Sequence, residues 1–221
     1  MAIDIWLLQK HYLSNHPPTL RFYTWSPSAI SLGYHQRNYP QEWENLVWNN
    51  QKLDLVRRPT GGRAVLHHGD LTYSVITSEL SRSRIEAYKQ ICEFLIQGWN
   101  KLGVDLHYGD AGRGYIHNPN CFGTATSADL VMSDGSKLIG SAQLRKDRAI
   151  LQHGSMRLNP DAELFQKVFG EELFDSVISV KNLNIEKIIK VLVEAASGCF
   201  DIKFNLQPLN DIEWEEILRD S

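Results

Sequence analysis

The segment RRPTGGRAVLHHGDLTYSV, from Arg57 to Val75, places three arginines, a glycine pair and two histidines between apolar stretches. Paired glycines let a backbone turn sharply and expose its N–H groups, because no Cβ stands between them and a ligand. A concavity of N–H groups suits a phosphate, a carboxylate or a carbonyl oxygen that gains charge. The alternative is an ordinary hairpin with arginines on its surface. The pattern matches neither the phosphate loop GxxxxGK[ST] nor a GxGxxG turn that opens a helix.

Strand geometry decides which side chains of this segment can meet at the bend, since neighbouring residues of a strand point to opposite faces. Of Arg57 and Arg58 we therefore expect one to face the bend, and we expect Arg63 to approach it from the far side. Of His67 and His68 we expect one to face a substrate and the other to lie at the surface. A third ligand is missing nearby, so the segment does not predict a metal site.

Outward from this segment, the sequence predicts an α+β fold in which a mostly antiparallel sheet is flanked by helices. Apolar residues recur at steps of three and four between Arg84 and Leu102, which is typical of an amphipathic helix that Gly103 would end. Further helices are expected at 1–13 and in the C-terminal part from about residue 162. We predict strands at 19–25, 29–36 (joined to the first by a Ser-Pro-Ser turn), 53–59, 63–68 and 71–77, and a three-stranded meander at 128–132, 137–145 and 149–158.

Length and composition fit one soluble globular domain, which we expect to span residues 1–221. The chain is 43% hydrophobic and 22% charged, and its formal net charge of -3 gives no overall basic field for nucleic acid. Its apolar runs are shorter than the roughly 18–20 residues of a membrane span, and its start lacks the basic region of a signal peptide. We therefore expect a cytoplasmic protein.

The cysteines differ in their surroundings. Their number is odd and they lie far apart, which disfavours both a disulfide framework and a zinc site. Cys92 and Cys199 fall in predicted helices and are expected to pack in them. Cys121 falls in a segment rich in Gly, Asn, Thr and Ser that predicts a long loop at 109–127, and loops of that length are usually functional or disordered. A thiolate there could hold an acyl group during transfer from one carrier to another.

Three segments, in this order along the chain, resemble the lipoate/biotin protein ligase and octanoyltransferase superfamily. They are MAID at 1–4, RRPTGGRAVLHHGDLTYSV at 57–75 and KLIGSAQLRKDRAILQHGS at 137–155. The resemblance covers residues 1–158 and implies the biotin/lipoate ligase-like catalytic fold.

Within this superfamily, the chain is most similar to the cysteine-dependent octanoyltransferases. These carry a Cys-Phe dipeptide shortly before the lysine of a K-x-x-G-S-A-Q motif, and here Cys121-Phe122 precedes Lys137 by 16 positions. The resemblance implies that Cys121 and Lys137 are the catalytic residues, with the acyl group held on Cys121. Because a neighbouring cation lowers the pKa of a thiol, Lys137 would also activate Cys121. The alternative for Lys137 is a solvated lysine at a strand end.

The resemblance also implies a substrate-binding set. The glycine bend would lie beside the acyl carbonyl or the pantetheine, and the small residues at 140–142 would flank a narrow alkyl tunnel. The arginines at 57, 58 and 63 could meet an acidic carrier surface. The residues expected to bind substrate are Arg58, Thr60, Gly61, Gly62, Arg63, Val65, His67, Gly140, Ser141, Ala142, Gln143, His153 and Gly154.

The implied activity is transfer of an octanoyl group from octanoyl-acyl carrier protein to the lysine of an apo lipoyl domain, in protein lipoylation. The acceptor would be the glycine-cleavage H protein or the E2 subunit of a 2-oxoacid dehydrogenase. We expect no required cofactor, no metal, no nucleic acid or membrane partner, and a monomer. One alternative is an ATP-dependent lipoate–protein ligase that uses ATP and magnesium and grips an acyl-adenylate. Another is a non-catalytic protein that binds lipoyl domains without turnover.

Overall fold

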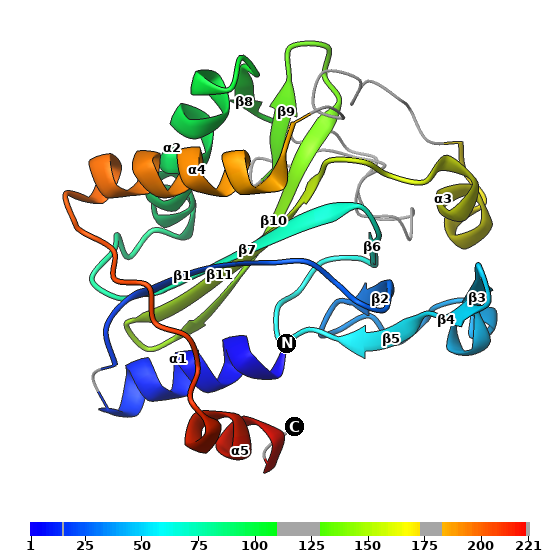
Figure 1. The fold of residues 1–221 in the computed structure, drawn as a ribbon, viewed down its shortest axis with the longest axis horizontal. Helices are drawn as coiled ribbons and strands as arrows, with labels where there is room; N and C mark the ends of the chain where they lie inside the picture. The colour runs from blue at the N-terminus through cyan, green and yellow to red at the C-terminus, as the bar shows by residue number, and fades with distance from the viewer. Residues whose placement is uncertain (15, 110–128, 173–182, 220–221) are drawn as a thin grey trace.

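One large sheet organises the protein (Figure 1), whose computed structural model describes residues 1–14, 16–109, 129–172 and 183–219. Within these residues, six strands follow the order β1-β7-β11-β10-β9-β8, and neighbouring strands pair antiparallel. The predicted antiparallel sheet is therefore confirmed, and its meander is present as β9, β10 and β11. The strands are β1 (Thr19–Tyr23), β7 (Asp70–Thr77), β8 (Leu106–Tyr108), β9 (Leu130–Met132), β10 (Lys137–Lys146) and β11 (Ala149–Arg157).

A smaller sheet lies beside the large one and consists of β5 (Asp54–Arg57), β2 (Ala29–Leu32) and β6 (Val65–His67), in that order. β2 pairs parallel with β5 and antiparallel with β6. A ribbon of β3 (Val47–Trp48) and β4 (Gln51–Lys52) completes this side of the molecule. The strands predicted at 19–25 and 29–36 do form, but they belong to different sheets because each pairs with a distant segment.

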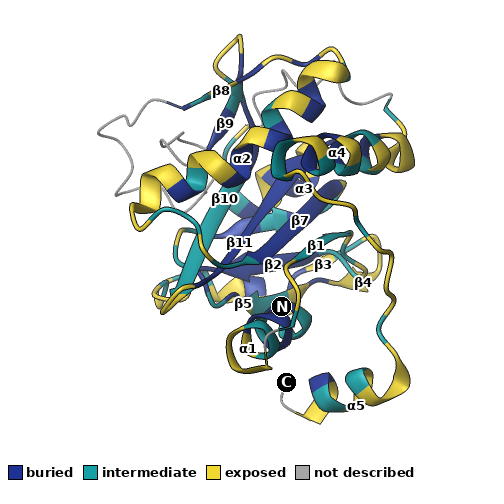
Figure 2. Cartoon of the chain, turned by 90° about the vertical axis from the view of Figure 1, so that its left-hand side faces the viewer, coloured by how far each residue is buried: buried dark blue, intermediate teal, exposed yellow. Residues whose placement is uncertain are grey.

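Helices cover both faces of the large sheet (Figures 1 and 2). α2 and α4 lie on one face, and α1 packs against β7 and β11 on the other. Among the described residues, the structure shows no helix that is long and apolar enough to cross a membrane. The helices are α1 (Ala2–Ser14), the 3-10 helix η1 (Gln41–Asn45), α2 (Arg84–Lys101), α3 (Ala162–Phe169), α4 (Ile185–Phe200) and α5 (Asp211–Arg219).

Local sequence signals set the ends of α2, which confirms the predicted amphipathic helix. The Ser83 side chain accepts a hydrogen bond from the backbone N–H of Glu86 and so satisfies one of the free donors of the first turn. Gly103 follows the helix with a φ of 83°, in the left-handed region that glycine adopts without strain. Asn184 caps α4 by accepting from the N–H of Glu186.

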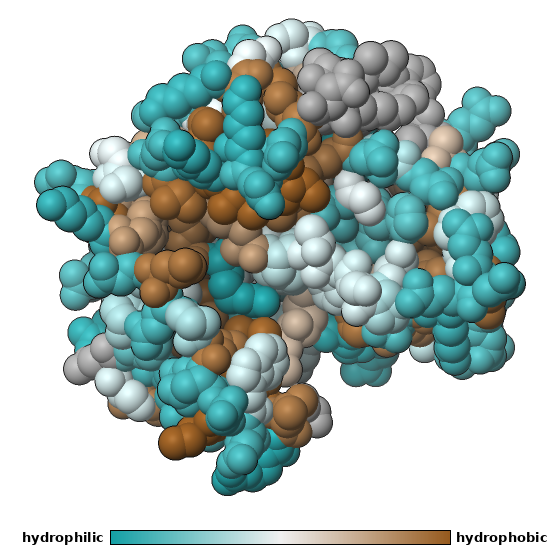
Figure 3. Space-filling view, in the orientation of Figure 1, coloured by the Kyte–Doolittle hydropathy of each residue, from teal (hydrophilic) through white to brown (hydrophobic). Residues whose placement is uncertain are grey.

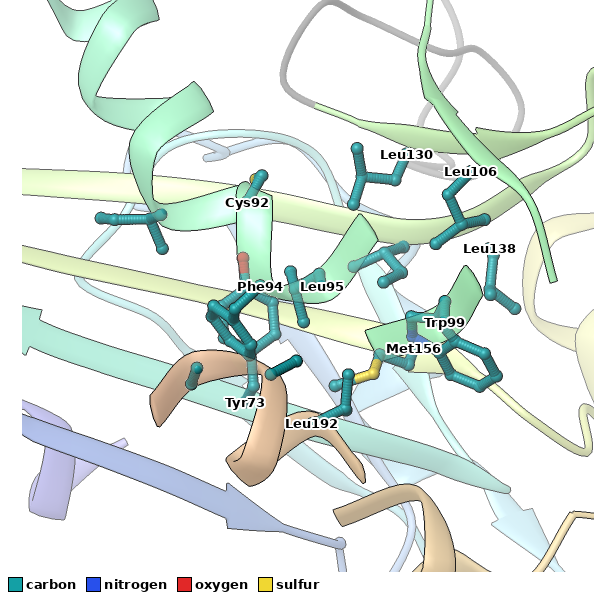
Figure 4. Close-up of a cluster of buried hydrophobic side chains, with 14 of the residues drawn as sticks. Tyr73, Cys92, Phe94, Leu95, Trp99, Leu106, Leu130, Leu138, Met156 and Leu192 are labelled. Atoms are coloured by element: carbon teal, nitrogen blue, oxygen red, sulfur yellow. The ribbon is translucent and has the colours of Figure 1, made fainter. Parts of the chain in front are cut away.

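The main hydrophobic core fills the space between the large sheet and its two covering helices (Figure 4). Phe94, Leu95 and Trp99 of α2 meet Tyr73 of β7 and Leu192 of α4, and all five side chains are fully buried. Cys92 belongs to the same core, as its place in the predicted helix indicated. Hydrophobic residues also reach the surface along α4 (Figure 3).

Candidate functional site

A cavity is lined by residues of both sheets, and its lining includes ten of the thirteen residues predicted to bind substrate. The smaller sheet and its bend provide one side, whereas β7, β10 and β11 provide the other. The predicted residues that line it are Arg58, Gly61, Gly62, Val65, His67, Gly140, Ser141, Ala142, His153 and Gly154. The lining is completed by Met1, Ser31, Thr72, Asp129 and Ser155.

The glycine bend is held in place by the buried guanidinium of Arg58. Its Nη1 donates to the carbonyl oxygen of Ser31 at 2.8 Å, and its Nη2 donates to the carbonyl oxygens of Gly61 at 2.9 Å and Arg63 at 2.7 Å. Arg57 is exposed, and its Nη1 caps the carbonyl oxygen of Gly33 at 2.8 Å. One arginine therefore faces the bend and the other faces away, as strand alternation predicts.

Glycine is needed where the bend meets the end of β2. A Cβ on Gly33 would lie only 1.8 Å from the carbonyl oxygen of Gly62, so a larger residue would push the bend away. Gly62 itself has a φ of 98°, which side chains other than glycine rarely adopt. The bend is thus not the ordinary surface hairpin of the alternative interpretation, since its position depends on both chain segments.

Three residues predicted to bind substrate do not appear in the lining. Thr60 is buried, and its Oγ1 lies 2.6 Å from Nε2 of His153, which does line the cavity. Gln143 donates through Nε2 to Oε1 of Gln152 at 3.0 Å, next to Ala142, which does line the cavity. Arg63 lies at the end of the bend, where its carbonyl oxygen accepts from Arg58. All three lie next to residues that line the cavity, and the motif alone could not predict which side chains face inward.

Lys137, a predicted catalytic residue, does not itself line the cavity but forms a buried ion pair with Asp129, which does. Its Nζ lies 2.9 Å from Oδ1 of Asp129, and the two residues are 4% and 3% exposed. The interpretation of Lys137 as a solvated strand-end residue is therefore wrong. The role of Asp129 was not predicted, although an acidic residue directly before the apolar strand Leu130–Met132 was a signal that could have identified it.

Cys121 lies outside the described residues, as does the predicted loop at 109–127 apart from Gly109. The described residues on either side of that segment, Gly109 and Asp129, meet each other. The backbone N–H of Gly109 donates to the carbonyl oxygen of Asp129 at 2.9 Å, and Asp129 lines the cavity. Asp129 therefore joins three features, since it lines the cavity, accepts a hydrogen bond from Gly109 and contacts the ammonium of Lys137.

The two described cysteines are poor nucleophiles. Burial raises the pKa of the Cys92 thiol to about 12, and it also raises the pKa of Cys199, which is half-buried on α4. A thiol reacts as its thiolate, so neither side chain is activated near neutral pH. Their predicted packing role agrees with these positions.

The two adjacent histidines lie in different environments, as predicted. His67 is buried, with its Nδ1 2.8 Å from Oδ2 of Asp70 and its Nε2 2.9 Å from Oγ of Ser31. The half-buried His68 instead has its Nδ1 2.7 Å from Oγ of Ser28, away from the residues that line the cavity. Among the described residues, the structure places no group of three His, Cys, Asp or Glu side chains that could hold a metal ion.

His153 links the cavity to the buried carboxylate of Asp4 on α1. Its Nδ1 lies 3.6 Å from Oδ2 of Asp4, and burial lowers the pKa of His153, so the ring is neutral near pH 7. Burial opposes the charge of Asp4, but the interaction with His153 and the charge of Arg21 outweigh it and lower the pKa of Asp4. In the sequence, Asp4 stood out only as part of a motif, and this network was not predicted.

The sequence and the fold resemble those of known proteins. Residues 1–197 match the family model of the lipoyl protein ligase A/B catalytic domain. An octanoyltransferase of Lysinibacillus sphaericus, named LipM, is 40% identical over 77% of this chain and 65% of its own length. A LipM octanoyltransferase of Bacillus cereus is 37% identical over 92% of this chain and 80% of its own length. The chain thus spans slightly less than two thirds of the Lysinibacillus relative.

A solved structure shares the fold. The bi-partite lipoate protein ligase of Thermoplasma acidophilum, studied with its E2 lipoyl domain, matches with a TM-score of 0.70. The match covers 98% of this chain and 86% of the other, at 20% sequence identity. This likeness confirms the ligase-like fold predicted from the sequence.

Proposed function

Because the chain belongs to the lipoyl protein ligase A/B catalytic domain family, we propose that it transfers an octanoyl group to a lipoyl domain, with Cys121 carrying the group. The observation that carries this proposal is the position of Asp129. It lines the cavity, forms the ion pair with Lys137 and is hydrogen bonded to Gly109 at the other end of the Cys121 segment. The names of the curated relatives support octanoyl transfer as the reaction.

In the first step, the Cys121 thiolate attacks the thioester carbonyl of octanoyl-acyl carrier protein. A new carbon–sulfur bond forms, the old one breaks, and the carrier thiolate leaves and takes up a proton. In the second step, the neutral amine of the acceptor lysine attacks the acyl-enzyme. An amide bond forms, the amine loses a proton, and the Cys121 thiol is restored. The thioester supplies the driving force, so the reaction needs neither ATP nor a metal.

Lys137 has two tasks in this scheme. Its ammonium stabilises the thiolate of Cys121, which lowers the pKa of that thiol, and it polarises the acyl carbonyl. Asp129 holds the ammonium at the cavity edge through the 2.9 Å contact. Gly61 and Gly62 of the bend, which Arg58 fixes, line the same cavity, and in this scheme their backbone N–H groups bind the oxygen that gains charge.

The two partners are an acyl carrier protein as donor and an apo lipoyl domain as acceptor. The acceptor is supported by the family description and by the lipoyl domain studied with the Thermoplasma ligase. The exposed Arg57 provides a positive charge beside the bend for an acidic carrier, where complementary charge speeds encounter.

Intact-mass measurement tests the proposal directly. The protein is incubated with octanoyl-acyl carrier protein without ATP, and we expect one octanoyl adduct that disappears when an apo lipoyl domain is added. Cys121→Ser should form no thioester adduct and transfer at a small fraction of the wild-type rate. Cys199→Ser is the matched control and should behave like wild type. An adduct of unchanged yield in Cys121→Ser would show that the proposed carrier of the group is wrong.

The same protein offered lipoate and ATP, in place of the thioester, tests the ligase alternative. Lipoylation with release of pyrophosphate, and no reaction with the thioester, would replace octanoyl transfer by ligation. Binding of the lipoyl domain without either reaction would favour the non-catalytic alternative.

A further inference from the structure

The cavity wall formed by β6, β7 and β11 carries polar side chains, although the proposed substrate brings an alkyl chain. His67, Thr72 and Ser155 all line the cavity. A polar group that loses water to an apolar chain without another hydrogen bond costs free energy. A cavity that binds an alkyl chain must therefore satisfy these groups from within the protein.

Asp70, the first residue of β7, satisfies all three from behind the wall. Its Oδ2 accepts from Oγ of Ser155 at 2.6 Å, from Nδ1 of His67 at 2.8 Å and from Oγ1 of Thr72 at 3.2 Å. Because a carboxylate only accepts hydrogen bonds, Nδ1 of His67 carries the proton in this contact. Asp70 is 4% exposed and is absent from the cavity lining. One buried oxygen thus collects three polar groups of the wall.

His67 and Thr72 each form a further polar contact within the protein. Nε2 of His67 lies 2.9 Å from Oγ of Ser31, and Oγ1 of Thr72 accepts from Nε1 of Trp25 at 2.9 Å. The Trp25 ring stacks on the His67 ring, with centroids 4.2 Å apart and planes 19° apart. These contacts fix the orientation of the imidazole, so its hydrogen-bonding atoms point to Asp70 and Ser31.

We propose that Asp70 is a positioning residue that makes the cavity wall apolar toward the acyl chain and thereby sets the preference for longer chains. By drawing the polar groups of His67, Thr72 and Ser155 to itself, it leaves carbon-bound hydrogens to contact the substrate. This inference rests on the proposed function, because the occupant is taken to be an alkyl chain. Each methylene that leaves water for a dry apolar site improves binding about fourfold, so two methylenes give roughly 15-fold.

The test compares chain lengths in wild type, Asp70→Asn and Asp70→Ala. Binding of hexanoate and octanoate is measured by calorimetry, and KM and kcat are measured with hexanoyl and octanoyl thioesters. Wild type should prefer the octanoyl chain roughly 15-fold, the ratio expected for a dry cavity. In Asp70→Ala, the three groups take up water or turn into the cavity, and we expect the preference to fall to about threefold or less. Asp70→Asn should lie between, and the change should appear in KM rather than in kcat.

Ser155→Ala separates this role from a merely structural one. It removes one polar group of the wall while Asp70 stays, so the preference for octanoyl should remain at the wild-type ratio. In Asp70→Ala, three polar groups of the wall lose Asp70 as their acceptor, whereas in the double variant Asp70→Ala/Ser155→Ala only two do. Part of the preference for the octanoyl chain should therefore return in the double variant. Asp54→Ala is the control for loss of an aspartate, because Asp54 is exposed on β5.

A folded Asp70→Ala variant that keeps the wild-type chain-length ratio overturns the inference. If that variant does not fold, Asp70→Asn decides, and a wild-type chain-length ratio in Asp70→Asn would overturn the inference. The outcomes also separate this inference from the proposed function. If octanoyl transfer is absent but the ratio for the free acids depends on Asp70, the function fails and the inference stands. If transfer occurs with a ratio independent of Asp70, the function stands and the inference fails.

Discussion

The two faces of the large sheet are built from alternate residues of the same strands, yet they differ in chemistry. On the face toward α2 and α4, Tyr73 and Val75 of β7 meet a core of large apolar side chains (Figure 4). On the opposite face of β7, which we call the polar face, Ile76 packs in a smaller apolar cluster with α1, but Thr72 and Ser74 contact the buried carboxylates Asp70 and Asp4. Figure 2 shows the central strands β7 and β11 in dark blue, because nearly all of their residues are buried. Burial alone therefore does not distinguish the stabilising face from the face that forms the site.

The polar face should be the more sensitive to a single change, and Asp4 tests this most strongly. Asp4 is fully buried and accepts from Nη1 of Arg21 at 2.5 Å, from Oγ of Ser74 at 2.9 Å and from the hydroxyl of Tyr23 at 3.1 Å. Removal of one partner of a buried charged network costs about 3–5 kcal/mol. We expect Asp4→Asn to lower the free energy of unfolding by about 4 kcal/mol, measured by urea denaturation.

The acid dependence of Asp4→Asn gives a second measurement. The folded state lowers the pKa of Asp4, so its stabilisation is fully present above the unfolded value of 3.8 and is lost as pH falls below it. The variant should lose less stability than wild type on acidification through this range. Equal losses in the two proteins would mean that Asp4 is not the group responsible.

A substitution on the apolar face, which packs against α2 and α4, should lower the free energy of unfolding somewhat less than Asp4→Asn does. Leu95 is fully buried in the core between α2, α4 and the sheet. Leu95→Ala removes buried apolar surface and leaves a cavity, which costs about 3 kcal/mol in well-packed cores. The loss should appear in urea denaturation while KM for the octanoyl thioester stays unchanged. A raised KM in this variant would mean that the two faces are coupled.

The two faces also differ in how far the sequence predicts them. The steps of three and four in α2 predicted a helix with one buried side, because an amphipathic pattern depends only on local spacing. The glycine pair and the small residues before Gln143 predicted where the cavity lies, through the family resemblance. The networks around Asp4 and Asp70 were not predicted, because their members meet only after distant strands pair. Asp4 and His153, for example, are brought together by the packing of α1 on β11.

At the edge of the polar face, Lys137 should affect the rate more than the stability. Lys137→Met removes the ammonium that the proposed mechanism requires and leaves Asp129 without this partner. We expect kcat for octanoyl transfer to fall about 100-fold, within the range for loss of one electrostatic contact to a developing charge. Lys146→Met, at the exposed end of the same strand, is the matched control and should keep the wild-type rate. A rate unchanged in Lys137→Met would remove this residue from the mechanism.

His153 should give the smallest effect, and its pH dependence distinguishes it from Asp4. Burial lowers the pKa of His153 below its ordinary value of 6.5, so the unfolded chain binds a proton more readily than the folded one. The contribution of the neutral His153 to the free energy of unfolding is therefore fully present above pH 6.5. It decreases as the pH falls from 6.5 to the lowered pKa of the folded state. His153→Asn should flatten the stability profile in that interval by about 1 kcal/mol per pH unit. The effect of Asp4 on stability begins only near pH 3.8. If the stability profile of His153→Asn flattens near that pH and not in the interval below pH 6.5, the group that titrates is Asp4 and not the imidazole.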